Sequence, residues 1–309
     1  MAITASMVKE LREISGAGMM DCKKALTKTD GDMDKAIEFL RENGLAKAAK
    51  KAGRVAAEGM VATNLSADGK TAAIVEVNSE TDFVAKNEKF QTYVSRVAAQ
   101  VAASSAKDVE TFLAEPWIED SSKTVNENLA SMIAVIGENM TIRRFDKIEA
   151  TDGIVESYIH AGGKIGVLVQ AKTDANSAAV KECLKNVAMQ VAALNPKYTS
   201  DAEVDQSYIE HEKEILKAQA QKEKPDAPEK IIDGMVMGRI KKELKEICLL
   251  DQVYVKAEDG KQSVKQYVDS VAKAEGISLE IKKFVRFETG EGIEKVETDF
   301  AAEVAAQLK

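Results

Sequence analysis

Side chains suited to acid–base or metal chemistry are few and scattered along this 309-residue sequence. The only histidines are His160 and His211. The pair His211-Glu212 begins like the helix of a zinc protease, but Ile215 stands where that motif requires its second histidine. His160 stands alone, and a lone histidine is more often a hydrogen-bonded surface residue than a base or a ligand. The histidines therefore predict no metal centre.

Other common chemical motifs are also missing from the sequence. No GxxxxGK[ST] phosphate loop occurs, no GxGxxG follows a strand pattern, and no residue occupies a known nucleophile elbow. The three cysteines are far apart and lack a metal-binding spacing, so we expect buried, reduced thiols: Cys22, Cys183 and Cys248. A catalytic site needs polar groups that converge in a cleft. We therefore predict a protein that is not an enzyme and needs no cofactor.

Composition narrows the classes of partner and compartment. The formal net charge of −8 disfavours broad phosphate binding, and aromatic residues, at 5%, are too few for a base-stacking platform. No apolar run is long enough to span a bilayer, and Met1–Lys9 lacks the layout of a signal peptide. These features favour a cytoplasmic protein of two or more domains that binds neither nucleic acid nor a membrane directly.

Three short helices are predicted in residues 1–54. Gly16 ends the first helical pattern, a second helix spans about Met19–Leu26, and Asn43-Gly44 ends the third. This pattern predicts a helical bundle near the size limit for independent folding. Four basic residues follow: Lys47, Lys50, Lys51 and Arg54. A nucleic-acid patch is one interpretation, but a solvated linker helix suits the acidic chain better.

An internal repeat follows the bundle. Gly59–Val77 (GMVATNLSADGKTAAIVEV) aligns without a gap with Gly153–Ala171 (GIVESYIHAGGKIGVLVQA), 94 residues further on. Each copy has the pattern of a β-hairpin with a glycine turn. A helix is predicted after each hairpin, at about Asp82–Ala106 and at about Ser177–Leu194.

Each copy continues with a second helix and a further strand. The first copy has a helix ending near Ile136 and a strand over Met140–Ile148. The second has a helix over Val264–Ala274 and a strand over Leu279–Phe287. We predict an α+β fold whose core is two similar halves, each a sheet covered by helices. The predicted divisions are a bundle (1–54), a first half (55–149), a second half (150–200 and 251–288), an insertion (201–250) and a C-terminal module (289–309).

The insertion has the pattern of an antiparallel helical hairpin. A charged helical stretch over Val204–Lys224 ends at Pro225, and Glu229–Ile247 carries an apolar stripe along one side. The stripe suits packing on itself, on a second copy of the chain or on a partner. Gly292–Lys309 has the pattern of a last helix, which either packs on its own core or docks a partner.

Three segments together resemble one known family. Leu11–Leu26 (LREISGAGMMDCKKAL) and Glu76–Lys86 (EVNSETDFVAK) look like its two signature stretches, and Phe287–Val304 (FETGEGIEKVETDFAAEV) is similar to its C-terminal part. The chain resembles the bacterial elongation factor Ts family, the nucleotide exchange factors of the GTPase elongation factor Tu, from residue 1 to residue 309. Ser15 stands where the family usually has threonine, and Ile136–Asn139 also looks familial.

The resemblance implies both a fold and a mechanism. The fold is an N-terminal three-helix ubiquitin-associated-like bundle, a pseudo-duplicated α+β core, an inserted antiparallel helical hairpin and a C-terminal helix. The implied protein binds GDP-loaded elongation factor Tu, disturbs its Mg²⁺ and phosphate site, releases GDP and is displaced on GTP reloading. A homodimer, or a complex of two copies with two GTPase molecules, stays open.

The resemblance gives a partner-binding and Mg²⁺-dislocating role to Thr81, Asp82, Phe83 and Val84. It implies that Asp82 and Phe83 intrude between two helices of the GTPase domain. Phe83 then acts as an apolar wedge, and Asp82 accepts hydrogen bonds or repels nearby acids. From the residues alone, Thr81 or Asp82 suits a helix N-cap equally well, and Phe83 suits a core. The similar tripeptide at 298–300 lies inside a helical pattern and is interpreted as structural.

Five further residues match partner-binding positions of the family: Arg12, Met19, Met20, Gly137 and His160. The first three belong to the surface of the bundle that holds the GTPase domain. Adjacent methionines on a helix point about 100° apart, so we expect one of them to fill the core in part. Gly137 permits a close backbone approach or simply a turn, and His160 lies near the partner's phosphate side or is an ordinary surface residue.

Two other classes of function compete with nucleotide exchange. A scaffold or chaperone-like adaptor would use the bundle and the helical hairpin for docking. A small-molecule enzyme would use a cleft between the halves of the core. Only an exchange factor would accelerate GDP release from elongation factor Tu at sub-stoichiometric amounts.

Overall fold

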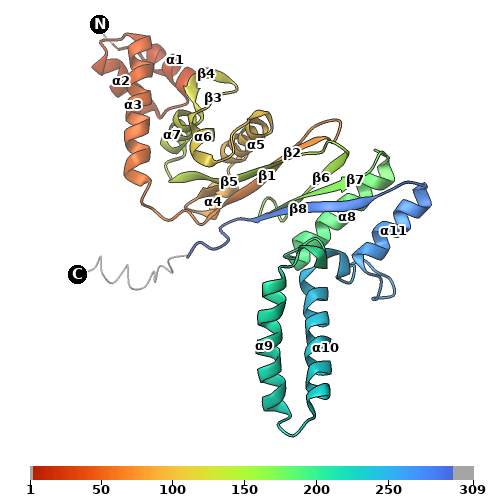
Figure 1. The fold of residues 1–309 in the computed structure, drawn as a ribbon. Helices are drawn as coiled ribbons and strands as arrows, with labels where there is room; N and C mark the ends of the chain where they lie inside the picture. The colour runs from red at the N-terminus through yellow and green to blue at the C-terminus, as the bar shows by residue number, and fades with distance from the viewer. Residues whose placement is uncertain (1–2, 295–309) are drawn as a thin grey trace.

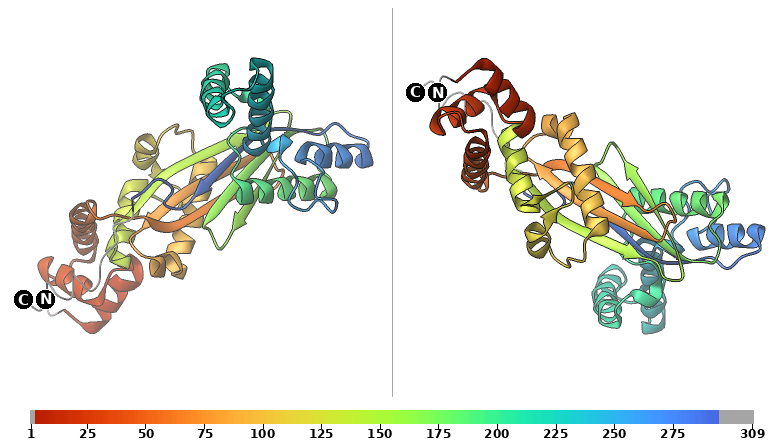
Figure 2. Two further views of the ribbon diagram at one scale, coloured as in Figure 1. Left: turned by 90° about the horizontal axis from the view of Figure 1, so that it is seen from below. Right: turned by 90° about the horizontal axis from the view of Figure 1, so that it is seen from above.

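A computed structural model describes residues 3–294 of the chain (Figure 1). The fold is α+β, as predicted, and it is elongated, with the N-terminal helices at one end and a helical hairpin projecting from the core (Figure 2). The predicted C-terminal helix lies almost entirely outside the described residues.

The N-terminal bundle consists of three helices: α1 (Ala5–Ser15), α2 (Met19–Lys28) and α3 (Met33–Lys51). Its small core holds buried residues of all three helices, among them Leu11, Leu26 and Ala36. The prediction that Asn43-Gly44 ends the third helix is wrong, because α3 continues to Lys51. Gly44 is buried at a contact with the core, so its lack of a side chain serves packing rather than termination.

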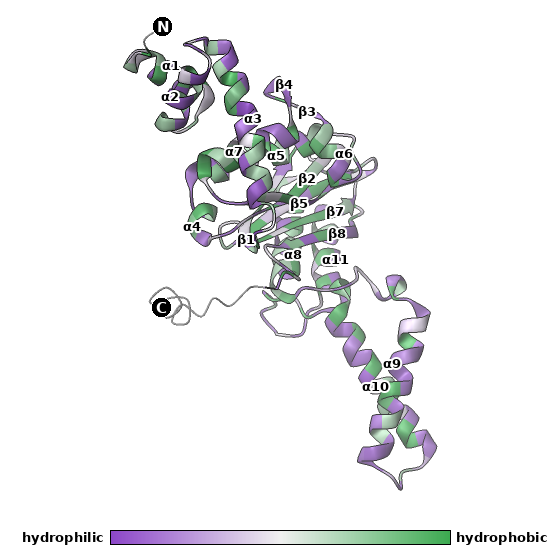
Figure 3. Ribbon diagram, turned by 90° about the vertical axis from the view of Figure 1, so that its left-hand side faces the viewer, coloured by the Kyte–Doolittle hydropathy of each residue, from purple (hydrophilic) through white to green (hydrophobic). Residues whose placement is uncertain are grey.

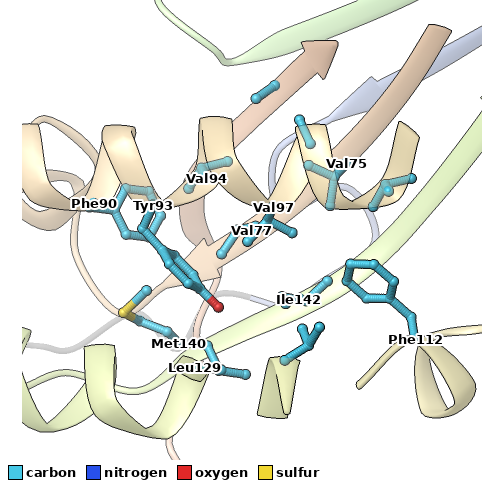
Figure 4. Packing of buried hydrophobic residues seen from close by; sticks show 14 of the residues in the cluster. Val75, Val77, Phe90, Tyr93, Val94, Val97, Phe112, Leu129, Met140 and Ile142 are labelled. Atoms are coloured by element: carbon cyan, nitrogen blue, oxygen red, sulfur yellow. The ribbon is translucent and has the colours of Figure 1, made fainter. Parts of the chain in front are cut away.

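The first half of the core is a sheet of order β1-β2-β5 with helices on one face. Its strands are β1 (Glu58–Leu65), β2 (Thr71–Ser79) and β5 (Met140–Glu149), and its helices are α4 (Asp82–Ala85), α5 (Glu88–Ala103), α6 (Val109–Ala114) and α7 (Val125–Ile136). A small hairpin of β3 (Pro116–Trp117) and β4 (Asp120–Thr124) precedes α7. Figure 4 shows Val97 of α5 over Val77 of the sheet, with Phe90 and Tyr93 further along the same helix.

The helix predicted over Asp82–Ala106 is in fact two helices. The chain breaks between α4 and α5 because the side chain of Asn87 accepts a hydrogen bond from the backbone N–H of Lys89 and thereby caps α5. Four residues are therefore separated as the short helix α4, which lies at the edge of the first sheet (Figure 1).

The second half is a sheet of order β6-β7-β8 with helices on its outer face. Its elements are β6 (Gly153–His160), β7 (Ile165–Lys172), β8 (Glu280–Glu288), α8 (Ala178–Leu194) and α11 (Val264–Glu275). Single turns of 3-10 helix at Asp201–Glu203 and Leu249–Asp251 flank the insertion.

The hairpin repeat predicted from the sequence is present in the pairing of the strands. Gly59 lies opposite Asn78 in the first half, and Gly153 lies opposite Lys172 in the second. Each residue of the second pair is therefore 94 positions after its equivalent in the first pair. Either glycine would bring an added Cβ within 2.2 Å of a carbonyl oxygen across the strand pair. This close approach explains why both copies begin with glycine.

The repeat extends further than the sequence comparison showed. Arg143 in β5 and Lys282 in β8 are the extra residues of two β-bulges, and they are 139 residues apart. The helices α7 and α11 both have 12 residues, begin after the capping boxes of Thr124 and Ser263, and end at a left-handed glycine. The two halves are therefore copies of one unit that differ in their insertions.

The inner faces of the two sheets pack against each other, so the core has four layers, with helices outermost (Figure 2). Two backbone hydrogen bonds join the halves at equivalent places: Val61 N donates to Gly163 O and Val155 N donates to Gly69 O, both at 2.7 Å. The inter-sheet core consists of Val61, Ala72, Ile74, Ile148, Ala150, Val155, Leu168 and Phe287.

A buried carboxylate lies at the edge of this inter-sheet core. Glu76 is fully buried and accepts hydrogen bonds from Arg143 at 3.0 Å, from Arg144 at 2.5 Å and from the backbone N–H of Gly290 at 2.8 Å. Arg144 also stacks over the ring of Phe287. Burial alone would raise the pKa of Glu76, but the hydrogen bonds from Gly290, Arg144 and Asn78 outweigh it and lower that pKa. One charged group thus ties the first sheet to the end of the last strand.

The insertion is an antiparallel hairpin of α9 (Gln206–Glu223) and α10 (Glu229–Ile247), as the pattern predicted. Its apolar residues pack on each other between the helices, around Ala220, Ile232, Val236 and Ile240. Hydrophilic and hydrophobic residues alternate along both helices of the hairpin (Figure 3). Of the three packing modes left open by the sequence, the structure shows the stripe packed on itself.

The two ends of the insertion meet at the core. The backbone N–H of Lys197 donates to Ile247 O at 2.8 Å, and that of Leu249 donates to Tyr198 O at 2.9 Å. We therefore expect that replacing 206–246 with a short glycine–serine loop leaves a folded core, because a changed loop length costs little free energy. Thermal melting should remain a single cooperative transition, with a midpoint within about 5 °C of the intact chain. A broad or multistep transition would show that the hairpin is part of the core.

A second prediction concerns Glu76. Its folded-state pKa lies below the ordinary value of 4.5, so its stabilising effect is complete above that pH and is lost as pH falls through the folded-state pKa. Glu76→Gln should lower the free energy of unfolding at pH 7 by about 3 kcal/mol, since it leaves two guanidinium groups without their shared anion. The difference from the unsubstituted protein should shrink below about pH 4.

Urea titrations at pH 7 and pH 3.5 would measure this difference. Glu149→Gln is the matched control, because Glu149 pairs with Lys147 at 2.8 Å but its side chain is exposed. A pH-independent cost of Glu76→Gln would contradict the role of the carboxylate charge.

Candidate partner-binding site

Phe83 stands out in the first half because it is a large apolar side chain with 82% of its surface exposed. It lies in the first turn of α4, where the Thr81 side chain accepts a hydrogen bond from the backbone N–H of Val84. Val84 is buried in the first-half core and holds the helix down. The interpretation of Phe83 as a core residue is therefore wrong, while Thr81 is the N-cap that the pattern allowed.

The turn that carries Phe83 is held from behind by the segment after α7. Glu138 accepts hydrogen bonds from the backbone N–H of Thr81 at 3.0 Å and from its hydroxyl at 2.7 Å. Next to it, the backbone N–H of Asn139 donates to Glu80 at 2.5 Å. The role of Glu138 and Glu80 was not predicted, although Ile136–Asn139 looked familial. These contacts fix the direction in which Phe83 points.

Asp82 lies beside Phe83 and is partly exposed. Lys86, one helical turn on, donates to its carboxylate at 2.6 Å, and this hydrogen bond lowers the pKa of Asp82, whereas burial acts in the opposite direction. Glu58 and Lys164 also act on this carboxylate, and they pair with each other at 2.7 Å. Because Lys164 follows β6 in the second half, the anionic Asp82 lies near the junction of the two halves.

Gly137 and His160 lie on turns of different halves. Gly137 ends α7 in the left-handed conformation, is exposed, and accepts a hydrogen bond from Lys51 of α3 at its carbonyl oxygen. Since Gly137 directly precedes Glu138, it belongs to the support of the Phe83 turn. His160 ends β6 and is exposed, and its Nδ1 lies 3.0 Å from the Tyr158 hydroxyl. The structure therefore places His160 as a hydrogen-bonded surface residue.

The bundle presents a separate apolar surface. Met19 and Met20 are 55% and 74% exposed, and Arg12 on α1 is exposed as well. The expectation that one methionine fills the core in part is wrong, because Cys22 and Leu26 of the same helix occupy that space. Ile14 of α1 is also exposed and was not predicted.

The inner faces of the two halves pack against each other in the described part of the chain. The space between the halves is filled by side chains such as Ile74 and Leu168, which are fully buried, so the cleft imagined for a small-molecule enzyme is closed. Within residues 3–294, no group of three or more His, Cys, Asp or Glu side chains is arranged to hold a metal ion. No helix among these residues is both long and apolar enough to cross a membrane.

Large apolar side chains exposed on two surfaces are typical of a protein that acts by binding another protein. Comparison with known proteins identifies the family to which such a protein belongs. A family model described as "Elongation factor TS" matches residues 80–291. The chain is 55% identical over 306 residues to "Elongation factor Ts" of Clostridium botulinum (strain Eklund 17B / Type B), covering 99% of each chain.

Other relatives agree. The identity is 57% over 303 residues to the protein of that name from Clostridium perfringens (strain SM101 / Type A), covering 98% of each chain. It is 53% over 306 residues to that from Clostridium novyi (strain NT), covering 99% of each. The chain therefore belongs to the elongation factor Ts family, and the resemblance seen in its sequence is confirmed.

The exposure of Phe83 generates a direct prediction. Phe83→Ala should leave the melting temperature of the free protein unchanged, because the side chain makes few contacts that could be lost. Phe90→Ala is the matched control, since Phe90 is fully buried in the same half and its loss should cost about 3–5 kcal/mol. Circular dichroism melts of both variants would measure this contrast. Equal destabilisation by the two substitutions would place Phe83 in the core.

Proposed function

We propose that this protein is the guanine nucleotide exchange factor of elongation factor Tu in translation elongation. The observation that carries the proposal is Phe83, an exposed phenyl ring on a turn fixed by the hydrogen bonds between Thr81 and Glu138. Membership of the elongation factor Ts family supports it. In this proposal the protein makes and breaks no covalent bond and acts by differential binding.

Phe83 is the proposed wedge between two helices of the GTPase domain. Full burial of an exposed phenylalanine side chain stabilises a complex by about 1.5–3 kcal/mol, which corresponds to roughly 10- to 150-fold in an equilibrium constant. Because the turn is already rigid in the free protein, little conformational entropy is lost when the ring is buried. That free energy is therefore available to stabilise the form of the partner whose helices are displaced.

Asp82 has a complementary proposed role. Its carboxylate is anionic at neutral pH, as the lowered pKa indicates. Next to a Mg²⁺ and phosphate site, such an anion disfavours bound phosphates and competes for hydrogen-bond donors that hold the nucleotide. Lys86 keeps this charge paired in the free protein at 2.6 Å.

Release and reloading of nucleotide follow from linkage. If the factor lowers the affinity of the GTPase for GDP by some ratio, bound GDP lowers the affinity for the factor by the same ratio. Incoming GTP then displaces the factor in the same way. The exposed surface of Arg12, Met19 and Met20 is proposed as a second contact that holds the GTPase domain while the nucleotide leaves.

Release of a fluorescent GDP analogue from elongation factor Tu tests the proposal. Sub-stoichiometric protein should accelerate release catalytically, and Phe83→Ala should reduce the acceleration about 10- to 100-fold, as the loss of its burial energy predicts. Ile118→Ala is the control, because Ile118 is 57% exposed on the β3–β4 turn and has no proposed contact. Binding without accelerated release would instead support the adaptor.

A further inference from the structure

The N-terminal bundle packs on one helix of the core, α7, and the contact of α3 with α7 is called the seat of the bundle. The outer part of α3 lies along α7, where Gly44 faces the backbone oxygen of Ala130 and the side chain of Ala134. The Arg41 guanidinium forms two hydrogen bonds with Glu127 at the start of α7. Its Nε donates to Oε1 at 3.1 Å and its Nη2 donates to Oε2 at 2.5 Å. At the other end, Lys51 donates to the carbonyl oxygen that ends α7. Helix α3 is thus held at several points along its contact with α7.

Glu127 does two things at once in this seat. It belongs to the capping box of α7, where it accepts from the backbone N–H of Thr124 at 2.8 Å. The same carboxylate receives the bidentate contact from Arg41, and the hydrogen bond from Arg41 is the main cause of its lowered pKa. The position of the bundle is therefore coupled to the first turn of α7.

The duplicated core contains a natural comparison for this seat. Helix α11 is the equivalent of α7 in the second half, and within residues 3–294 no helical bundle lies on it (Figure 1). Where α7 has Ala130 and Ala134, α11 has Asp269 and Lys273, and Asp269 pairs with Lys265 of its own helix. The small residues on α7 are thus a specialisation that admits α3, since the bare copy of the helix is polar at the same positions.

Helix α7 also reaches the proposed wedge. Its final turn leads through Gly137 into Glu138, which holds Thr81 and hence the direction of Phe83. One rigid helix therefore carries the bundle along its side and the support of Phe83 at its end. Two surfaces that are rigidly spaced bind one partner as a single bidentate ligand, whereas a freely tethered pair loses part of that effective concentration.

We propose that α7 is a positioning element that sets the spacing between the bundle surface of Arg12, Met19 and Met20 and the wedge Phe83, with Arg41 and Glu127 as its positioning residues. This inference rests on the proposed exchange function. Neither positioning residue needs to contact the GTPase. The bundle works while seated on α7 and does not have to leave it.

A disulfide across the seat tests the inference. The Cβ of a residue at position 44 would lie 3.9 Å from the Cβ of Ala134, within the range that a disulfide requires. The variant Gly44→Cys with Ala134→Cys should therefore cross-link on mild oxidation, while the three native cysteines are buried. The oxidised form should keep the affinity for nucleotide-free elongation factor Tu, and the rate of GDP release, within about two-fold of the reduced form.

The substitution Arg41→Ala provides the second part of this test. It should weaken binding of nucleotide-free elongation factor Tu by about 3- to 10-fold, because the seated bundle is no longer held in register. The cross-link should restore that affinity in the triple variant, which a direct contact of Arg41 with the partner would not allow. Arg96→Ala is the matched control, since Arg96 forms a 3.1 Å ion pair with Glu119 elsewhere in the first half and should change neither quantity.

Three results would overturn the inference: no cross-link on oxidation, loss of exchange in the oxidised form that reduction restores, or failure of the cross-link to rescue Arg41→Ala. Failure of the proposed function is distinguishable, because the unsubstituted protein would then not accelerate GDP release at all. In that case the rate of cross-linking and the protection of α3 amides from hydrogen exchange, compared with and without Arg41→Ala, still measure whether the bundle is seated.

Discussion

Close packing of the two sheets against each other is the constraint on which the rest of the structure depends. Two glycines make it sterically feasible. An added Cβ at Gly163 would lie 2.9 Å from the Met60 Cβ, and one at Gly166 would lie 2.4 Å from a Val61 methyl group. Because these backbones approach so closely, the β6–β7 turn of the second half lies near the α4 turn of the first. The candidate site at Phe83 is therefore built where two halves of the chain meet.

Local patterns predicted the regular elements well. Both hairpins, their glycine turns and the helix at Glu229–Ile247 follow from the spacing of apolar residues and from the glycine and proline residues between the elements. Gly44 shows where local rules fail. A glycine after asparagine commonly ends a helix, but here the contact with Ala134 of a distant helix compensates for its low helix propensity. The domain boundaries drawn from the sequence remain predictions.

The candidate site was only partly visible in the sequence, for a similar reason. Motif similarity pointed to Asp82 and Phe83, but the exposure of Phe83 and the support by Glu138 are products of tertiary structure. The pair Arg41–Glu127 joins residues 86 positions apart. Glu127 lies in the local capping pattern that starts at Thr124, but no local pattern links it to Arg41. Conversely, the pattern suggested that a methionine of α2 faces inward, whereas Cys22 and Leu26 already fill the small core.

The equivalent hydrogen bonds of Val61 with Gly163 and of Val155 with Gly69 have the arrangement of an isologous dimer interface, although both sides belong to one chain. In a homodimer of identical subunits, any new side chain appears twice, so a wedge on one side brings a wedge on the other. Covalent joining of the two copies removes this obligation. One half was free to acquire the anchored Phe83 turn and the helical seat for the bundle, and the other to accept the long helical hairpin, while the shared interface that stabilises both stayed the same.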